Sequence, residues 1–488
     1  MSKRPNVLIF MTDHQRRETM PGYGWCKTPV LEAFSQEAVV FTNAMCSAPH
    51  CCPSRASFFS GLYPSSHGVW NNVEVGNTLS RGLARGVRLW SQDLREAGYD
   101  LYYSGKWHVS SEEGSQDRGF TVLFDTKRYT GVRAADETRA PDTSEWARYD
   151  RARPSNPSAP RREGEIQRDG YLEYFLYGHN EQPYHDQQVV DAAIARIRAG
   201  FDPAAPWCLY VGTTGPHDPY DVPQRFLDLY DPEKIALPAN YRDSMRDKPA
   251  LYRRTQERYA QLSDAEHREA LRHYLAFCSY EDALFGQVCD ALRETGQYES
   301  TIILYLSDHG DYAGAHGLWA KGLPCFREAY AIPLLARLPG GAAGRSDYPV
   351  CITDIAPTLL ELCGVPLTRY MQGVSLAAIL RGQGEPPRRA YRFTQTNGNE
   401  QYGIQRAVYN DTWKYVFNGF DYDELYDLKN DPGELCNLAG DPRYADVIRK
   451  LSRELWRFAR ENDDTIVNPY IMTAFAPYGP GILKEDAE

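Results

Sequence analysis

Cys51 opens a segment in which residue types suited to chemistry follow at short spacing, with Pro53 and Arg55 close behind and Gly61 and Pro64 further on. A cysteine can serve as a nucleophile, and an arginine can bind an anion. The residues after Pro53 predict a helix, so that Cys51 would lie at the positive helix end, which suits a negatively charged group. The segment therefore predicts a nucleophile that acts on an anion, and a merely buried or reactive cysteine is the alternative.

Two carboxylates stand where predicted buried strands end. Asp13 and Asp308 each close an apolar run, and a histidine follows each of them, His14 and His309. A carboxylate in such a position is strongly destabilised unless a cation lies beside it. Oxygen ligands favour calcium or magnesium, with manganese as a further candidate. We therefore predict one divalent metal ion at Asp13 and Asp308, and a capping role of the two carboxylates is the simpler alternative.

The segment from Cys51 to Pro64 resembles the signature of type I sulfatases, in which a cysteine followed by Pro, Ser and Arg is oxidised to formylglycine. Cys51 matches this pattern because Pro53 and Arg55 follow it at the required distances, whereas Cys52 is one residue too close to both. The resemblance implies an alkaline-phosphatase-like α/β core and hydrolysis of a sulfate ester. It also implies a formylglycine-generating enzyme as a partner during maturation.

The chemistry of a hydrated aldehyde explains the use of such a residue. One of its two hydroxyls attacks sulfur and displaces the alcohol. The other then collapses to the aldehyde and expels sulfate, so the covalent intermediate breaks without attack of water on sulfur. A serine or a cysteine could perform only the first half of this reaction in the same way.

Three further segments resemble sulfatase landmarks. In the Gly105-Lys106-Trp107-His108 block, the resemblance implies that Lys106 contacts the sulfate and His108 the oxygens of the nucleophile. The turn at Pro216-His217-Asp218-Pro219 implies that His217 protonates the leaving alkoxide, although a satisfied loop histidine is the alternative. The Gly317–Lys321 block implies that Lys321 is a second sulfate-binding lysine. We expect Arg55, Lys106, Lys321 and the metal to surround one anion and to stabilise its developing charge.

The metal positions follow the family pattern only in part. Family members place an acidic pair at the first position and Asp-Asn or Asp-His at the last, which Asp308-His309 matches. His14 stands in place of the second acid. Whether it binds the metal directly or supports the ligands from behind stays open. A histidine at this position also favours an ion that accepts nitrogen ligands, such as manganese. Cys51, in its oxidised form, is also expected at the metal. Asn72, 21 residues after Cys51, is a further predicted substrate contact.

The elements that must position these residues are visible as continuous apolar runs. Residues 7–11, 208–212 and 301–306 predict strands that are buried on both faces of a parallel sheet. Helical patterns lie between them, for example at 191–198 and 273–292. We therefore predict a doubly wound, mostly parallel α/β sheet flanked by helices, in which ligands bind beyond the carboxyl ends of the strands.

The chain divides into a large domain and a small one. Residues 1–380 are the predicted catalytic domain, with an insertion or lid loop at 125–185 that is rich in Arg, Asp, Pro and Ser. Residues 381–467 predict a smaller C-terminal α+β subdomain that contains an antiparallel sheet and an amphipathic helix. Residues 468–488 predict an extended tail and a possible oligomer contact.

Composition excludes several classes of partner. The chain has 54 Lys+Arg and 65 Asp+Glu residues and a net charge of −11, without a long basic run, so a nucleic-acid partner is not expected. It contains no apolar run of about twenty residues, so no membrane span is expected. The 11 scattered cysteines and the short first apolar run, residues 7–11, predict a cytoplasmic enzyme with mostly free thiols.

Two alternatives stay open beside the sulfatase prediction. The first is a phosphonate monoester or phosphodiester hydrolase of the same superfamily. Lys106 and His108 favour sulfate, whereas His309 also occurs in the phosphonate group and in choline-sulfatase-like members. The second is a catalytically silent protein that binds sulfated ligands, but no member of the cluster is missing. The substrate would be a small-molecule or saccharide sulfate ester, whose alcohol could be a sugar, an aryl group or a quaternary amine.

Overall fold

The computed structural model describes residues 4–126, 155–168, 172–399, 401–468, 470, 475 and 477–484. Within these residues, an eight-stranded sheet has the strand order β11-β2-β10-β9-β1-β7-β4-β5. Neighbouring strands are parallel except for β10, which pairs antiparallel with both β9 and β2. The strands are β1 (Asn6–Thr12), β2 (Val39–Phe41), β4 (Asp100–Gly105), β5 (Thr121–Asp125), β7 (Trp207–Gly212), β9 (Thr301–Ser307), β10 (Leu334–Arg337) and β11 (Gly344–Ser346).

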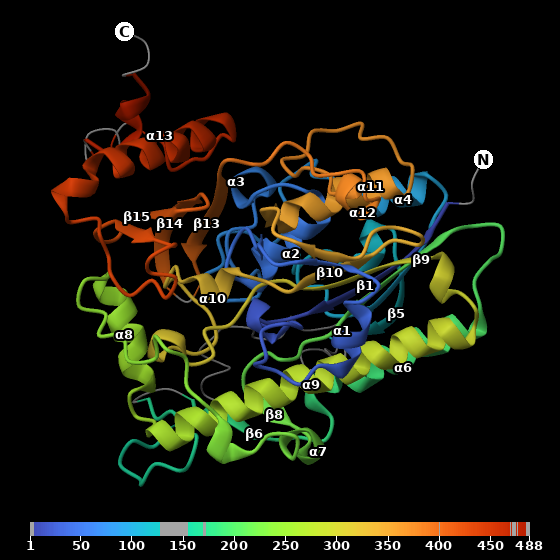
Figure 1. The fold of residues 1–488 in the computed structure, drawn as a ribbon, viewed down its shortest axis with the longest axis horizontal. Helices are drawn as coiled ribbons and strands as arrows, with labels where there is room; N and C mark the ends of the chain where they lie inside the picture. Colours follow the sequence, from blue (N-terminus) through green and yellow to red (C-terminus); the bar gives the residue numbers. More distant parts are fainter. Residues whose placement is uncertain are drawn as a thin grey trace, which may run out of the picture.

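The central strand β1 shows why its apolar run indicates a sheet covered on both faces. Val7, Ile9 and Met11 pack into one core cluster, and Leu8 and Phe10 pack into the other. Helices on both sides of the sheet complete the two clusters (Figure 1). One side has α2 (Cys51–Ser60), α4 (Trp90–Glu96), α11 (Ile355–Leu362) and α12 (Ala377–Leu380); the other has α1 (Pro29–Phe34), α6 (Asp186–Ala199), α7 (Gln224–Leu227) and α9 (Asp264–Glu294). The predicted doubly wound α/β fold is confirmed.

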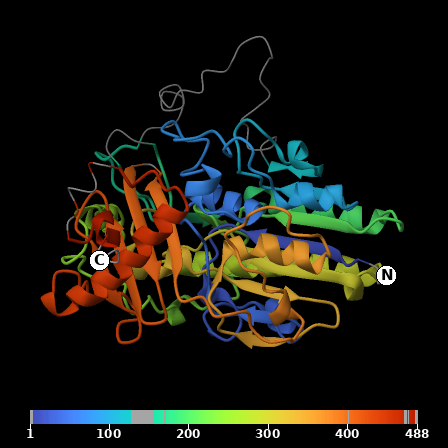
Figure 2. The same cartoon turned by 90° about the horizontal axis from the view of Figure 1, so that it is seen from above.

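The smaller C-terminal sheet has four antiparallel strands, and Figure 2 shows it with its helix at one end of the molecule. One face packs on the amphipathic helix α13, through Leu451, Leu455 and Trp456. The other face, which includes Val416 and Tyr426, belongs to a core cluster of the large sheet. The elements are β13 (Arg392–Gly398), β14 (Tyr402–Tyr409), β15 (Trp413–Asn418), β16 (Glu424–Asp427) and α13 (Ala445–Glu461). We did not predict β16, which is short and lies beside a turn-rich segment.

Further helices and strands lie between these elements. In the described part of the chain they are two strand pairs and three α-helices: β3 (Ala44–Met45) with β12 (Val350–Cys351), β6 (Tyr177–His179) with β8 (Tyr220–Val222), α3 (Pro64–His67), α8 (Ala250–Tyr259) and α10 (Arg327–Tyr330). In the described residues, no helix combines the length and the apolar character that crossing a membrane requires.

Two segments, the predicted insertion and the predicted C-terminal tail, are described only in part, and some of their described residues are packed. Of the insertion at 125–185, residues 127–154 and 169–171 lie outside the described residues. The described remainder includes Ile166 and Leu176, which are fully buried in the core, so this part is packed. In the C-terminal segment, residues Pro480–Lys484 form a 3₁₀ turn, and Ile482 packs against α13. In both cases apolar side chains bury in the core beside them, that of the large sheet for Ile166 and Leu176 and that around α13 for Ile482.

The carboxyl ends of the central strands lie side by side. Thr12 at the end of β1 is in register with Ser307 at the end of β9. Gly105 at the end of β4 is in register with Gly212 at the end of β7. Gly105 has a φ of +109°, and a Cβ there would lie 2.0 Å from the carbonyl oxygen of Gly212, so only glycine allows this approach. The residues that follow these strands are therefore brought to one edge of the sheet.

Candidate active site

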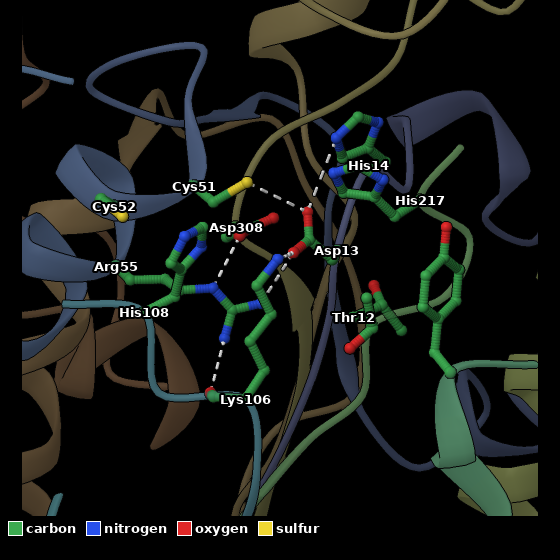
Figure 3. Close-up of polar contacts among 12 residues, drawn as sticks. Thr12, Asp13, His14, Cys51, Cys52, Arg55, Lys106, His108, His217 and Asp308 are labelled. Atoms are coloured by element: carbon green, nitrogen blue, oxygen red, sulfur yellow. Dashed lines mark hydrogen bonds and ion pairs between the residues drawn. The ribbon is translucent and has the colours of Figure 1, made fainter. Parts of the chain in front are cut away.

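Arg55 lies fully buried between the carboxylates that end the two central strands (Figure 3). Its Nε donates to Oδ2 of Asp308 at 2.8 Å, and its Nη2 donates to Oδ2 of Asp13 at 3.4 Å. Its Nη1 donates to the carbonyl oxygen of Lys106 at 3.1 Å and to the Tyr210 hydroxyl at 3.0 Å. Arg55 therefore binds protein groups and holds the two acidic residues in place, and its expected contact with a bound anion stays a prediction.

Asp13 is the residue on which the cations of the site converge. The ammonium group of Lys106 contacts its Oδ2, and its backbone N–H donates to the carbonyl oxygen of Gly215 at 3.1 Å. Burial by itself would raise the pKa of Asp13, but the charges of Lys106 and Arg55 hold it well below its usual range. Asp13 in turn raises the pKa of Lys106 despite burial of the lysine. Both groups are therefore charged at neutral pH.

Cys51 is the first residue of α2, as predicted, and its thiol faces this cluster. Its Sγ lies 3.5 Å from Oδ1 of Asp13 and 3.3 Å from Nε2 of His309. The Cys52 side chain points the other way into the hydrophobic core (Figure 3), where its Sγ accepts the backbone N–H of Val73 at 3.4 Å. Of the two adjacent cysteines, it is therefore Cys51 that adjoins the charged groups.

Hydrogen bonds to backbone carbonyls orient two histidine rings. Nδ1 of His309 lies 2.8 Å from the carbonyl oxygen of Gly310, and Nδ1 of His217 lies 2.6 Å from that of Asp218. Because a carbonyl oxygen can only accept, each Nδ1 carries a proton and each Nε2 is left for the site. Nε2 of His217 lies 3.3 Å from Nζ of Lys321. His309 can therefore offer a lone pair to a metal, and His217 can exchange a proton at Nε2.

His14, at a left-handed φ of +66°, is oriented by a carboxylate that the sequence reasoning missed. Its Nδ1 lies 3.0 Å from Oδ2 of Asp311, which also accepts the Tyr220 hydroxyl at 2.8 Å. Its Nε2 contacts the ammonium group of Lys321. Burial and neighbouring cationic groups lower the pKa of His14 well below its usual value, and burial raises that of Asp311 to about 7. The one available signal was the position of Asp311, three residues after Asp308 in the same loop.

His108 and Asn72 flank the start of α2. Figure 3 shows the His108 ring directed toward that helix end, and its Nε2 lies 3.9 Å from Oε2 of Glu74. Oδ1 of Asn72 accepts the backbone N–H of Cys52 at 3.2 Å. The backbone N–H of Asn72 donates to Oδ1 of Asn399 at 2.9 Å. Asn72 therefore supports the first turn of α2, and its predicted contact with substrate stays a prediction.

The C-terminal subdomain also borders the site. The backbone N–H of Gln395 in β13 donates to the carbonyl oxygen of Ser47 at 2.9 Å. Next to it, the hydroxyl of Thr396 lies 3.5 Å from Nδ1 of the buried His50, which immediately precedes the nucleophile position. The β13 strand therefore packs against the segment that leads into α2.

Two other histidines, His67 and His316, have structural roles. Nδ1 of His67 accepts a backbone N–H at 3.1 Å, and its Nε2 lies 3.0 Å from the Ser57 hydroxyl. Nδ1 of His316 lies 2.7 Å from Asp243, and its Nε2 lies 2.9 Å from Asn240. Both rings are buried, and their nitrogens are engaged in these contacts.

The acidic and histidine side chains form two overlapping groups that fit one divalent cation. In each group, one ligand atom from every member lies within 4.8 Å of all the others; the groups are Asp13, Cys51, Asp308 and His309, and Asp13, His14, Cys51 and His217. Carboxylate oxygens with one or two imidazole nitrogens suit a hard or borderline divalent ion. The geometry thus agrees with a metal site at the ends of β1 and β9.

Comparison with known proteins decides which family uses this arrangement. A sequence model described as Sulfatase matches residues 5–365, and one described as N-sulphoglucosamine sulphohydrolase, C-terminal, matches residues 314–461. The chain belongs to the sulfatase family. Choline-sulfatase from Rhizobium meliloti (strain 1021) is 30% identical over 455 residues, which cover 90% of this chain and 83% of that protein. This sulfatase is therefore a sulfuric ester hydrolase of the alkaline phosphatase superfamily, and the predicted family and enzyme class are confirmed.

Solved structures share the fold of this sulfatase. The phosphonate monoester hydrolase from Silicibacter pomeroyi superimposes with a TM-score of 0.75 at 23% identity, covering 95% of this chain and 97% of that one. A structure solved with its substrate D-glucosamine-2-N,6-O-disulfate has a TM-score of 0.72 at 20% identity, covering 95% and 99%. At these identities the likeness establishes the fold. The sequence relatives favour hydrolysis of a sulfate ester over the phosphonate alternative.

Proposed function

We propose that this sulfatase uses a formylglycine made from Cys51, together with one divalent metal ion, to hydrolyse a small-molecule or saccharide sulfate ester. The observation that carries the proposal is the placement of the Cys51 thiol beside Asp13 and His309, while Cys52 faces the core. Once formed and hydrated, the formylglycine would supply one hydroxyl to attack sulfur and a second hydroxyl whose loss of a proton releases sulfate.

Asp13, Asp308 and His309 would hold the metal together with the modified Cys51. The ion would offset the two carboxylates and withdraw charge from a sulfate oxygen, and calcium suits the oxygen-rich donors best, with manganese and magnesium as competitors. Arg55 keeps both carboxylates in position, because it donates to each of them. His14 belongs to the second ligand group, and its hydrogen bond to Asp311 directs Nε2 toward the site.

Two lysines would bind the sulfate oxygens from different sides. Lys106 extends from the end of β4 and contacts Asp13. Lys321 contacts the rings of His14 and His217, and within the described residues it has no carboxylate within 4.0 Å. Since no acidic partner neutralises Lys321 at contact distance, its charge is available to an anion. Fixed ammonium groups in a buried site stabilise negative charge that develops on the peripheral oxygens.

His217 would protonate the leaving alcohol oxygen. Its Nδ1 is fixed on the carbonyl oxygen of Asp218, so the exchangeable proton is at Nε2, beside Lys321. Its side chain is 27% exposed, whereas that of His14 is fully buried, so His217 is accessible from the open side of the cluster. His108, directed toward the start of α2, would contact the oxygens of the nucleophile. The two histidines thus serve the leaving group and the nucleophile, respectively.

The names of the relatives suggest which alcohols to test. They include a choline-sulfatase, an N-acetylglucosamine-6-O-sulfatase from Bacteroides thetaiotaomicron and an arylsulfatase from Clostridium perfringens. We infer a substrate of the same general class, the sulfate ester of a small alcohol or a sugar. A panel of choline sulfate, a sulfated glucosamine, an aryl sulfate and an aryl phosphonate would rank the candidates by kcat/KM. Faster cleavage of the phosphonate than of every sulfate would overturn the proposal.

The decisive experiment is a peptide mass spectrum across Cys51 and Cys52, on protein produced together with a formylglycine-generating enzyme. An aldehyde or its hydrate at Cys51, with Cys52 unmodified, is the expected result. A full complement of unmodified thiol at Cys51, although a control sulfatase is matured in the same cells, would contradict the proposed nucleophile.

A further inference from the structure

A buried acid supports the loop that connects β7 to His217. Asp186 is the first residue of α6, and its side chain is fully buried. Its Oδ1 accepts the backbone N–H of Thr214 at 2.8 Å, and its Oδ2 accepts that of Gly215 at 2.7 Å. Both oxygens are therefore used to hold two successive peptide groups of the loop.

A second buried acid touches the same loop from α9. A Cβ placed on Gly215 would lie 2.3 Å from Oε1 of Glu281, so this carboxyl group is packed directly against the loop backbone. Glu281 is fully buried, and the polar groups that it faces are the carboxyl group of Asp186 and the hydroxyl of Thr213. Within the described parts of the chain, neither acid forms an ion pair with a lysine or an arginine. Two unpaired carboxylate charges in such a place would be strongly destabilising.

The hydrogen bonds available to Asp186 and Glu281 show how the two acids can lie side by side. Two carboxylates cannot bond to each other, because both are acceptors, but an acid can donate its proton to a carboxylate. Asp186 accepts two backbone N–H groups, which stabilise its ionised form, and it lies in the first turn of a 14-residue helix, where the dipole favours negative charge. Glu281 accepts no hydrogen bond from a donor among the described residues. The shared proton therefore belongs on Glu281.

We propose that Glu281 stays protonated and donates to Asp186, and that this acid pair positions the loop that bears His217. The loop also touches the metal side of the site, because the carbonyl oxygen of Gly215 accepts the N–H of Asp13 at 3.1 Å. One pair of buried acids thus sets the relation between the residue that would protonate the alcohol and a residue that would hold the metal. The role of His217 in this inference rests on the proposed function, but the shared proton does not.

The electrostatics of the surroundings agree with this arrangement. Burial and the neighbouring Asp186 raise the pKa of Glu281 well above its usual range, and burial raises that of Asp186 to about 7. The other titratable groups whose charges act on the pair are Lys106, Tyr184, Cys278, Tyr280 and Tyr305. Of these only Lys106 is cationic, and it lowers the pKa of Asp186, which again assigns the charge to Asp186 and the proton to Glu281.

Infrared difference spectroscopy tests the shared proton without any enzymatic assay. We expect the spectrum of the wild type minus that of Glu281→Gln, recorded at pH 7.5, to show the C=O stretch of a protonated carboxylic acid that shifts in D₂O. Asp282→Asn is the matched control, since Asp282 is the next residue of α9, is also buried and accepts the N–H groups of Val30 and Leu31 at the other side of the helix. A difference spectrum without this band would overturn the proposal, whether or not the protein cleaves sulfate esters.

The positioning role is tested by the kinetics of a pair of variants. Glu281→Leu removes the donor, and we expect kcat to fall by about 10- to 100-fold, as for other residues that orient catalytic groups. The fall should be larger for an alkyl sulfate than for a nitrophenyl sulfate, because only a poor leaving group needs the proton of His217. Glu281→Gln keeps an N–H donor and should restore most of the loss, while Asp282→Asn should leave kcat unchanged. Equal losses of kcat for both substrates, without rescue by Glu281→Gln, would contradict the positioning role. If Glu281→Leu does not fold, the infrared spectrum still shows whether Glu281 is protonated.

Discussion

Nδ1 of His14 lies 3.0 Å from Oδ2 of Asp311, and both side chains are fully buried. Asp311 is itself held by the Tyr220 hydroxyl at 2.8 Å and by the backbone N–H of Ala313 at 2.8 Å. The His14 ring is therefore fixed from behind, and its Nε2 points to Lys321. A fully buried acidic residue thus decides how a histidine and a lysine of the site are oriented.

We expect Asp311→Ala to lower kcat/KM by about 10- to 100-fold, because His14 loses the partner that orients it. Metal affinity, measured by titration calorimetry, should fall over the same range if His14 is a ligand. Asp221→Asn is the control, since Asp221 adjoins Tyr220 in β8 but makes no contact with His14. An equal loss in both variants would mean that the effect is general destabilisation and not orientation of His14.

The two adjacent cysteines should behave differently. Cys51→Ala removes the proposed nucleophile and should reduce kcat on the order of 10⁶-fold, as observed when other covalent nucleophiles are deleted. Cys52→Ala should lower stability but keep most of the activity, because its Sγ lies in the core and accepts only the N–H of Val73. Initial rates on an aryl sulfate check both variants, and inactive but folded Cys52→Ala protein would contradict this assignment.

Removal of Arg55 should destabilise the metal-free protein. Arg55→Ala leaves Asp13 and Asp308 buried without their shared partner, and we expect the free energy of unfolding to fall by about 3–5 kcal/mol. Arg198→Ala breaks an ion pair with Glu294 whose side chains are 59% and 55% exposed, and it should cost less than about 1 kcal/mol. Urea unfolding in the presence of a chelator measures both. Similar values for the two variants would argue against the role of Arg55 as the bridge between the carboxylates.

Metal removal should affect both activity and stability. Treatment with a chelator should abolish sulfate release, and calcium at about 100 times its dissociation constant should raise the free energy of unfolding by about 2.7 kcal/mol. The double variant Asp13→Asn/Asp308→Asn should lose this calcium-dependent increase. Parallel titrations with magnesium and manganese rank the ions. Full activity after exhaustive chelation, with no metal detected by mass spectrometry, would exclude the proposed metal site.

His67 should make stability depend on pH in the acid range. Burial lowers the pKa of His67 to about 3 from a usual value near 6.5, and the ring contacts Ser57 and a backbone N–H. As the pH falls below about 6.5, the unfolded chain binds a proton that the folded chain does not, so stability is lost progressively down to about pH 3. His67→Gln cannot titrate, and the difference in unfolding free energy between wild type and variant should shrink over this window. Parallel curves would contradict the assignment.

The sequence was sufficient for features that depend on local pattern. The apolar runs at the start of β1, β7 and β9 predicted a parallel sheet, because strands buried on both faces must be apolar throughout. The spacing of Pro53 and Arg55 after Cys51 pointed to the nucleophile, and Cys51 does begin a helix beside the charged cluster. Short strands such as β2 and the edge strand β11, with three residues each, carry too little pattern to be predicted.

The sequence by itself thus determined the family, the central sheet and most of the charged residues of the site, because these depend on residue types at fixed spacing. Only the tertiary structure decided how those residues are used: that Arg55 holds two carboxylates, that Asp311 orients His14, and that Glu281 and Asp186 both touch Gly215 in the His217 loop. These contacts join residues far apart in the chain, for instance Arg55 with Asp13, 42 positions apart, and His14 with Asp311, 297 positions apart. The energies of these contacts depend on how deeply the side chains are buried and on the geometry of single hydrogen bonds. Both are set only when the chain folds.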